Sequence, residues 1–245
     1  MTLTDTFRTL HQQGTFVMPN PWDRGSARIL QDLGFKALAT TSAGFARSIG
    51  KNDQQITRYE LVTHVAELTA VLEIPLNIDS ERLFPDDPGG ITETVRLLAE
   101  AGASGCSIED FRPSTGSIVP LSEAAEGVAE AAAACAEHGI VLTARCENLL
   151  YAAGDLDDTI ARLVAYREAG AEVVYPPGLV EGADITRVVA EVGAPVNVLA
   201  FPGTPPIEQL ATLGVRRVST GGALQTNAYR AMRHDAKALL ALQPD

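Results

Sequence analysis

The sequence is poor in cysteine, in basic residues and in long apolar runs. Its three cysteines, Cys106, Cys135 and Cys146, have neither disulfide-framework nor metal-ligand spacing, which favours a reducing, cytoplasmic location. Lysine and arginine number 19 against 31 acids, so the net charge is −12, and we expect no nucleic-acid or membrane partner. No basic-then-apolar leader opens the chain and no apolar run reaches about 18 residues, so we expect neither secretion nor a membrane span.

What the sequence does have is a regular alternation of short apolar runs with longer helical patterns that often end in glycine. We expect strands at 16–18, 35–39, 75–81, 104–108, 140–144, 172–175, 195–199 and 216–219, with loops at 44–57 and 111–120. Eight such β-then-α units in 245 residues predict an α/β fold, a single (β/α)₈ TIM-type barrel domain spanning 1–245. The alternative, an open doubly wound sheet, lacks a GxGxxG motif after the first strand.

Charged residues end three successive expected strands. The stretch Pro75–Glu81 ends in Asp79 and Glu81, the next ends in Glu109, and the third ends in Arg145. Alternate strand residues share a face, so Asp79 and Glu81 point the same way if the strand extends that far. Because active sites of such barrels lie at the carboxyl ends of the strands, these charges predict one site. The alternative is a set of unrelated charges that face solvent.

The residue types at this site indicate a particular chemistry. Carboxylates without histidine or cysteine nearby suit Mg²⁺, with Mn²⁺ as an alternative, rather than zinc. The planar guanidinium of Arg145 suits a bidentate grip on a carboxylate or phosphonate. Backbone N–H groups of the Thr41, Ser42 and Ala43 turn suit an oxyanion, although small residues there also allow close packing. Together these groups predict a site for a small dianion, such as an α-keto acid whose enolate a metal stabilises.

Several motifs, in order along the chain, resemble those of the isocitrate lyase/phosphoenolpyruvate mutase superfamily. They are Asn20–Arg28, Gly34–Ser42, Asp53, Asp79-Ser80-Glu81, Glu109-Asp110, Ala144-Arg145, Gly154–Asp158 and Ala165–Ala171. The resemblance implies a barrel, a small α-oxocarboxylate substrate, and a homodimer or homotetramer in which the C-terminal helix, here about 224–242, is often exchanged between subunits.

The resemblance also implies roles for individual residues. Metal ligands would be Asp79, Glu81 and Glu109; catalytic residues would be Arg145, Asp53 and Glu109; and substrate-binding residues would be Trp22, Thr41, Ser42, Ala43, Asp79 and Arg145. Independently of the resemblance, Tyr175 lies at the end of an expected strand, where it could bind substrate or act as an acid. Trp22 has the alternative of capping the barrel, and Tyr175 that of packing with a satisfied hydroxyl.

The chain departs from the superfamily in two loops. Residues 111–118 contain neither the cysteine nor the histidine of the isocitrate and methylisocitrate lyases, and Tyr175-Pro176-Pro177 replaces a histidine of the phosphonopyruvate enzymes. We therefore expect a Mg²⁺-dependent lyase or decarboxylase of a small α-oxocarboxylic acid that needs little acid catalysis from the protein. The alternatives are a phosphonopyruvate mutase or hydrolase, similar to carboxyvinyl-carboxyphosphonate phosphorylmutase, and a non-catalytic binder of oxo acids.

Some polar residues have simpler interpretations. The three cysteines are expected to be buried and structural, and the four histidines, which fall on helices or helix ends, are expected to be buried or at the surface without a catalytic role. Arg216 and Arg217 begin the last expected strand, at the end of the barrel opposite the site, where we expect surface ion pairs.

Overall fold

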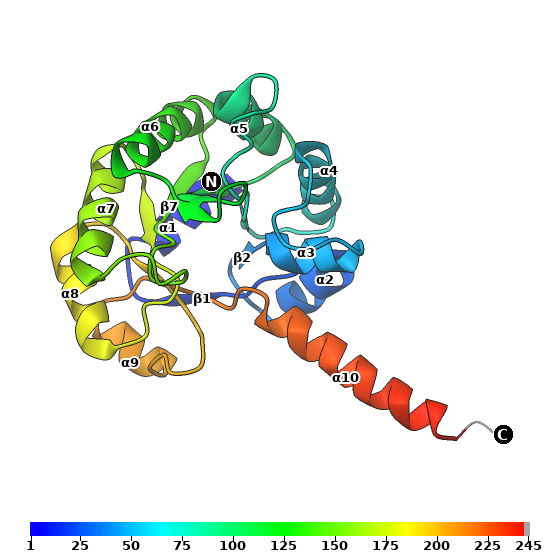
Figure 1. The fold of residues 1–245 in the computed structure, drawn as a ribbon. Coiled ribbons are helices and arrows are strands. Elements are labelled where there is room, and N and C mark those ends of the chain that lie inside the picture. The colour runs from blue at the N-terminus through cyan, green and yellow to red at the C-terminus, as the bar shows by residue number, and fades with distance from the viewer. Residues whose placement is uncertain (243–245) are drawn as a thin grey trace.

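The computed structural model describes residues 1–242 as a ring of parallel strands surrounded by helices (Figure 1). Residues 243–245 of the expected domain lie outside the described residues. The strands are β1 (Phe16–Met18), β2 (Leu38–Ala39), β3 (Leu76–Ile78), β4 (Gly105–Glu109), β5 (Phe111–Arg112), β6 (Ser117–Ile118), β7 (Val141–Arg145), β8 (Val173–Tyr175), β9 (Asn197–Leu199) and β10 (Arg217–Ser219). The helices are α1 (Leu3–Leu10), α2 (Arg24–Asp32), α3 (Ser42–Ser48), α4 (Arg58–Thr69), α5 (Gly90–Glu100), α6 (Leu121–His138), α7 (Leu156–Glu168), α8 (Gly182–Val192), α9 (Ile207–Thr212) and α10 (Ala223–Leu240).

The strands form the predicted barrel. One parallel sheet has the order β2-β3-β4-β7-β8 and another the order β1-β10-β9. A bridge between Val174 and Val196 joins the two sheets on one side. On the other side the Ala39 N–H donates to the Pro19 carbonyl at 3.2 Å. The β5–β6 hairpin is separate from the ring and antiparallel.

The seam beside β1 is held by the side chain of Asn20. Its Nδ2 donates to the Thr40 carbonyl at 2.7 Å, and its Oδ1 accepts from the N–H groups of Thr220 and Gly221, each at 2.9 Å. One buried amide therefore links the chain after β1 with the chain after β2 and after β10.

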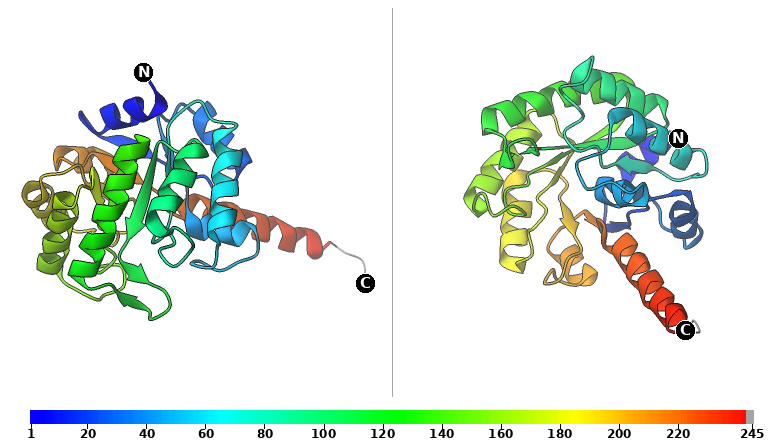
Figure 2. Two further views of the ribbon diagram at one scale, coloured as in Figure 1. Left: turned by 90° about the horizontal axis from the view of Figure 1, so that it is seen from above. Right: turned by 45° about the vertical axis from the view of Figure 1, so that its right-hand side comes forward.

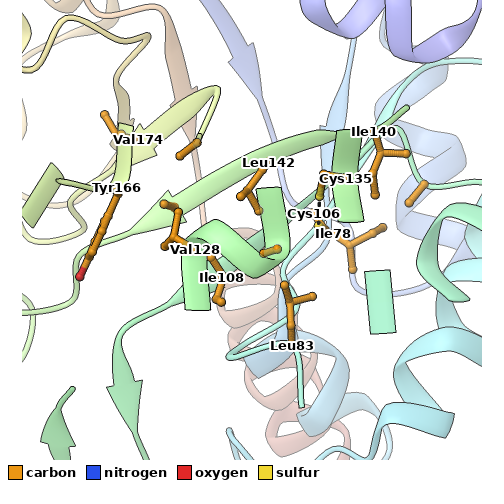
Figure 3. Close-up of a cluster of buried hydrophobic side chains, with 14 of the residues drawn as sticks. Ile78, Leu83, Cys106, Ile108, Val128, Cys135, Ile140, Leu142, Tyr166 and Val174 are labelled. Carbon is orange, nitrogen blue, oxygen red and sulfur yellow. Dashed lines mark hydrogen bonds between the residues drawn. The ribbon is translucent and has the colours of Figure 1, made fainter. Parts of the chain in front are cut away.

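Apolar side chains on the outer side of the strands pack against the helices to form the main core. Figure 3 shows Ile108 of β4 and Leu142 of β7 close to Val128 of α6, and Ile78 of β3 beside Cys106. All three cysteines are buried, as predicted, and the sulfurs of Cys106 and Cys135 lie 3.6 Å apart. The alternation of side chains thus sends apolar residues outward and leaves the polar ones for the barrel interior.

A second, smaller apolar cluster closes the N-terminal end of the barrel. Phe7 of α1 packs with Phe16, Met18, Val141 and other residues from the strand bottoms. The polar residues of the barrel interior therefore lie between this plug and the open end of the barrel.

Three segments differ from the sequence expectations. α3 occupies the first part of the expected 44–57 loop, because Thr41 caps its N-terminus by accepting from the Gly44 N–H at 3.2 Å. A short hairpin occupies much of 111–120. β3 ends at Ile78, and Glu81 has a φ of 49°, so strand alternation does not orient Glu81.

α10 projects away from the barrel in all three views (Figures 1 and 2). Of its residues only Gln225 is buried. None of the helices within residues 1–242 combines the length and the apolar character that crossing a bilayer requires.

Candidate active site

A cavity of about 200 Å³ opens at the carboxyl ends of the strands. Eight of the residues predicted for the site line it: Thr41, Ser42, Ala43, Asp53, Asp79, Glu109, Arg145 and Tyr175. Trp22 and Glu81 are not among the lining residues. The charges at the ends of three strands therefore do converge, as the barrel requires.

Arg145 is the centre of the charged part of the cavity. Its Nη1 lies 2.5 Å from Asp79 Oδ1, its Nε 2.8 Å from Glu147 Oε1, and its Nη2 3.4 Å from Glu109 Oε2. The parallel register places Glu109 beside Arg145 and Arg145 beside Tyr175. Each side of the guanidinium is thus directed at a carboxylate of the protein itself.

Burial governs the protonation of these groups. It raises the pKa of Glu109 well above the ordinary value, although Arg145 opposes the shift. It also raises the pKa values of Glu147 and Asp53, with nearby carboxylates adding to the effect. Burial alone would lower the pKa of Arg145, but Glu147, Asp79 and Glu109 raise it. The acids outnumber the cation, so this part of the cavity favours a further positive charge.

The turn predicted to bind an oxyanion is the N-terminus of α3, and Asp79 uses part of it. The N–H and the hydroxyl of Ser42 donate to Asp79 Oδ2 at 2.9 and 3.0 Å. The Gly44 N–H donates to Thr41. These contacts hold Asp79 in place between α3 and Arg145.

Glu81 is buried and does not line the cavity. Its Oε1 has no hydrogen-bond partner among residues 1–242. Burial, followed by repulsion from Asp79 and Asp53, raises its pKa to about 8. An unpartnered buried carboxylate oxygen beside further carboxylates has the donor chemistry that a hard divalent cation requires. As they stand, however, the side chains of residues 1–242 include no group of three or more histidine, cysteine, aspartate or glutamate residues placed to hold a metal ion.

The structure adds site residues that the sequence analysis did not identify. Glu147 is 1% exposed and contacts Arg145, and Gln54 Nε2 donates to Glu109 Oε1 at 2.7 Å. Glu147 follows Arg145 by two residues. This is the same spacing that pointed to Asp79 and Glu81 in the sequence, so Glu147 could have been predicted in the same way. No comparable pattern in the sequence indicates Gln54, which reaches Glu109 from the loop after α3.

Arg217 was expected in a surface ion pair, and that expectation is wrong. It is 1% exposed and lines the cavity, because the first residue of β10 faces the barrel interior. Its neighbour Arg216 lies outside the cavity lining, and there its Nη1 donates to the Gly14 carbonyl at 3.3 Å instead of forming the expected ion pair.

Aromatic residues border the cavity. The ring of Tyr175 lies 5.3 Å from the guanidinium carbon of Arg145, and burial raises its pKa to about 12. Tyr151 stacks on Phe111 of the hairpin with ring centroids 3.9 Å apart. Trp22 is half-buried and lies beside α3, where an added Cβ on Gly44 would be 3.3 Å from the Trp22 Cβ. No histidine or cysteine is found among the described residues that line the cavity.

Comparisons with known proteins identify the family of this chain. A family model described as phosphoenolpyruvate phosphomutase matches residues 7–240. The 2-methylisocitrate lyase of Escherichia coli K12 is 30% identical over 224 residues, which cover 86% of this chain and 74% of the lyase. Oxaloacetate decarboxylase 2 of Pseudomonas fluorescens Pf0-1 is 26% identical over 220 residues, covering 86% and 74%. A solved structure from Burkholderia cenocepacia J2315, a candidate lyase/mutase, is 48% identical with a TM-score of 0.90, covering 96% of this chain and 86% of that one.

Proposed function

Because this chain belongs to the phosphoenolpyruvate phosphomutase family of the isocitrate lyase/phosphoenolpyruvate mutase superfamily, we propose that it is a lyase or decarboxylase acting on a small α-oxocarboxylic acid. The observation that carries this proposal is the cavity itself. It joins a dense set of carboxylates to Arg145, with Arg217 deeper in the lining, and supplies no histidine or cysteine among its described lining residues. Such a site suits bond cleavage that leaves an enolate, because water can then protonate the product.

The protein's own groups have distinct roles in this proposal. The N-terminus of α3 and Arg145 hold Asp79 in position, and Gln54 does the same for Glu109. Tyr151 lines the cavity and is held by stacking on Phe111 of the hairpin, so its ring limits the access of bulk water on that side. Tyr175 remains protonated at neutral pH and is available as a hydrogen-bond donor beside Arg145.

We further propose that Asp79, Glu81 and Glu109 hold a divalent cation, Mg²⁺ or Mn²⁺. The unpartnered oxygen of Glu81 and the raised pKa values of Glu81 and Glu109 support this assignment. When bound, the cation would supply positive charge at the oxygen that becomes negative as the bond breaks. The contacts that Arg145 makes with three carboxylates would then have to loosen as the cation takes over part of their charge.

The proposed function is tested by incubating the protein with Mg²⁺ and oxaloacetate, 2-methylisocitrate or phosphonopyruvate, and following pyruvate by a coupled assay. We expect pyruvate from at least one oxo acid, and its loss when a chelator is added. Phosphorus NMR on phosphonopyruvate tests the mutase or hydrolase alternative, which the family match favours. Binding of these acids by a folded protein that turns over none of them would contradict a catalytic role.

A variant links turnover to the site. Glu109→Gln retains the hydrogen-bonding shape but removes a carboxylate that faces Arg145. We expect turnover to fall by about a hundredfold or more, since charge at the reacting centre is lost, while circular dichroism stays unchanged. Glu100→Gln, on the exposed end of α5, is the matched control. Equal turnover by Glu109→Gln and wild type would contradict the site assignment.

We also propose that α10 docks on a second copy of the chain, which would make the protein a homodimer or homotetramer. The support is its projection from the barrel and its exposed apolar residues, Met232 at 64% and Leu239 at 68% exposure (Figure 1). An isolated helix with an unburied apolar side is marginal in water.

A further inference from the structure

Asp110 follows the site residue Glu109 directly, yet it does not line the cavity of about 200 Å³. Neighbouring residues of a strand face opposite sides, so Glu109 at the end of β4 faces the barrel interior and Asp110 faces the surrounding helices. Both residues are buried. The proposed function uses Glu109 and gives its neighbour no role, although a buried carboxylate is costly unless it is paired.

The two oxygens of the Asp110 carboxylate have different partners. Oδ1 accepts from the backbone N–H of Glu147 at 2.8 Å. Oδ2 accepts from the Tyr166 hydroxyl at 2.5 Å and from Arg162 Nη1 at 3.3 Å. In Figure 3 the hydroxyl of Tyr166 points away from the apolar cluster. One oxygen of Asp110 therefore binds the loop after β7, and the other binds α7.

The partners on α7 are themselves held in place. Arg162 Nε donates to Asp158 Oδ2 at 2.9 Å, and Asn148 Nδ2 donates to the same oxygen at 2.9 Å. Tyr166 is buried. Asp158 and Tyr166 belong to the last two motifs of the superfamily resemblance. A largely buried polar network whose members are paired has one preferred arrangement, so Asp110 has a fixed position relative to α7.

Glu147 connects Asp110 with the centre of the site. Its backbone N–H donates to Asp110, and its Oε1 accepts from Arg145 Nε at 2.8 Å. The side chain of Glu147 is buried, so it moves little unless its backbone moves. The position of the Arg145 guanidinium therefore depends on where Asp110 holds the Glu147 backbone.

This connection becomes more important when a cation binds. Asp79 and Glu109 are proposed ligands of the cation, so their contacts with Arg145 loosen as the cation takes over part of their charge. Glu147 is not among the proposed ligands. Its own contact with Arg145 also loosens, but a backbone held by Asp110 limits how far the two side chains can separate. Arg145 then stays directed into the cavity that it lines.

We propose that Asp110 is a positioning residue, which holds Glu147 in place so that Glu147 keeps the guanidinium of Arg145 directed at the substrate. Asp110 itself contacts neither substrate nor cation. The inference rests on the proposed function, since an Arg145 that binds no substrate would need no positioning. A displacement of about 1 Å at a reacting centre can cost about a hundredfold in rate, so a residue outside the cavity can control the site.

Two substitutions separate positioning from structural support. Asp110→Asn keeps an oxygen for the Glu147 N–H but places an NH₂ group opposite Arg162, whose guanidinium only donates. Asp110→Ala removes both oxygens. Both variants lose contacts with α7 and should unfold at a lower temperature, but only Asp110→Ala frees the Glu147 backbone. Tyr166→Phe is the matched control, because it removes a partner of Oδ2 and leaves Oδ1 unchanged.

The first measurement needs no ligand. Nitrogen-15 NMR follows the exchange with water of the Arg145 Nε–H proton, which is assigned by its absence in Arg145→Lys. We expect Asp110→Ala to exchange this proton about tenfold faster or more, as the loss of one hydrogen bond to a charged group allows. Asp110→Asn and Tyr166→Phe should stay close to the wild-type rate although their melting temperatures fall.

The second measurement follows the consequence for binding. Oxalate is a planar dianion with the shape of the enolate of pyruvate, and calorimetric titration in Mg²⁺ gives its dissociation constant. We expect Asp110→Ala to bind oxalate about tenfold more weakly, which corresponds to one such contact. Asp110→Asn and Tyr166→Phe should bind it as wild type does.

Several outcomes would overturn the inference. A wild-type exchange rate in folded Asp110→Ala does so, and so does an Asp110→Asn that exchanges as fast as Asp110→Ala, because support of α7 alone then explains both. If Asp110→Ala fails to fold, Glu147→Asp decides: it draws the carboxylate back from Arg145, and an unchanged exchange rate contradicts the link. Wild type that neither binds oxalate nor releases pyruvate removes the proposed function alone, because the exchange rates are compared without ligand.

Discussion

His64 shows how a single buried side chain connects stability to pH. Its ring stacks on Phe45 with centroids 3.8 Å apart, and its Nε2 has no partner among residues 1–242. Burial lowers its pKa to about 4, although the charge of Asp23 opposes the shift. The folded protein therefore binds fewer protons than the unfolded chain between pH 4 and 6.5.

Neutral, buried His64 stabilises the folded protein at neutral pH. The stabilisation is complete above the unfolded pKa of about 6.5 and is lost as the pH falls through the folded value. We expect the free energy of unfolding to decrease by up to about 1.4 kcal/mol per pH unit for such a group. Urea unfolding at pH 7, 6 and 5 measures it. His64→Phe keeps an aromatic ring and should make the free energy of unfolding depend less on pH, although His11 still titrates. The control variant His234→Gln, on exposed α10, should leave the pH dependence unchanged. The same slope in His64→Phe would contradict this account.

Among individual residues, the sequence could predict those whose signal is local. Asp79, Glu109 and Arg145 each end an apolar run, and Tyr175 follows another, so alternation and barrel geometry suffice to bring them together. Arg217 starts its strand, and a charge at that position is usually solvated. Its burial depends on contacts with His11, Thr143 and Asn197, which are distant in the chain, so the sequence alone could not indicate it.

At the scale of elements, β4 and β7 approach each other so closely that Gly105 leaves no room for a side chain. A Cβ on Gly105 would lie 2.8 Å from the Val141 carbonyl oxygen and 2.9 Å from both Asn77 Oδ1 and a ring carbon of Phe7. The contact with backbone cannot be relieved by a rotamer change, so the strand itself would have to move.

We expect Gly105→Ala to lower the free energy of unfolding by about 1–3 kcal/mol, as overpacking commonly does. Gly25→Ala, in α2, is the control: its added Cβ would meet only Asp23 at 3.5 Å, and alanine favours a helix. Thermal unfolding of both variants should show a lower midpoint for Gly105→Ala alone. A midpoint equal to that of wild type would show that the strands can separate without cost.

The elements were predictable where their pattern was long. The apolar periods of α6 and α7 and the short strands between glycines follow from spacing alone. α3 and the β5–β6 hairpin were expected to be loops, because each is short and lacks a clear apolar period. Thr41 as a cap is a local signal for α3, but only tertiary contacts, such as those of Ser42 with Asp79, show what that helix does.

At the scale of the whole molecule, α10 is the element that the barrel does not explain. Met232, Ala236 and Leu239 recur at three- and four-residue spacing and share one side of the helix. If this side docks on a second copy, Met232→Glu with Leu239→Glu should lower the mass measured by light scattering after gel filtration. Arg230→Ala, on the opposite side, should leave the mass unchanged. An unaltered mass in the double variant would contradict docking through α10.

The barrel as a whole was predictable because its repeat is regular and its length matches. The arrangement of subunits could not be predicted, because the exposed side of α10 does not itself identify the surface that covers it. The domain boundary and helix exchange therefore stay predictions, as does a cytoplasmic location.

The Asn20 seam has a consequence for how the chain reaches its native state. Asn20 bonds to Thr220, 200 residues later, so β1 gains one of its two neighbours only when β10 has been synthesised. Contacts of such long sequence separation close slowly. A growing chain on the ribosome would hold β1 with one edge unpaired until β10 emerges, which exposes that edge to chaperones or to wrong pairing. Pulse-labelled hydrogen exchange during refolding should find the amides of β1 and β10 protected last; early protection would show that the seam closes before the rest of the ring.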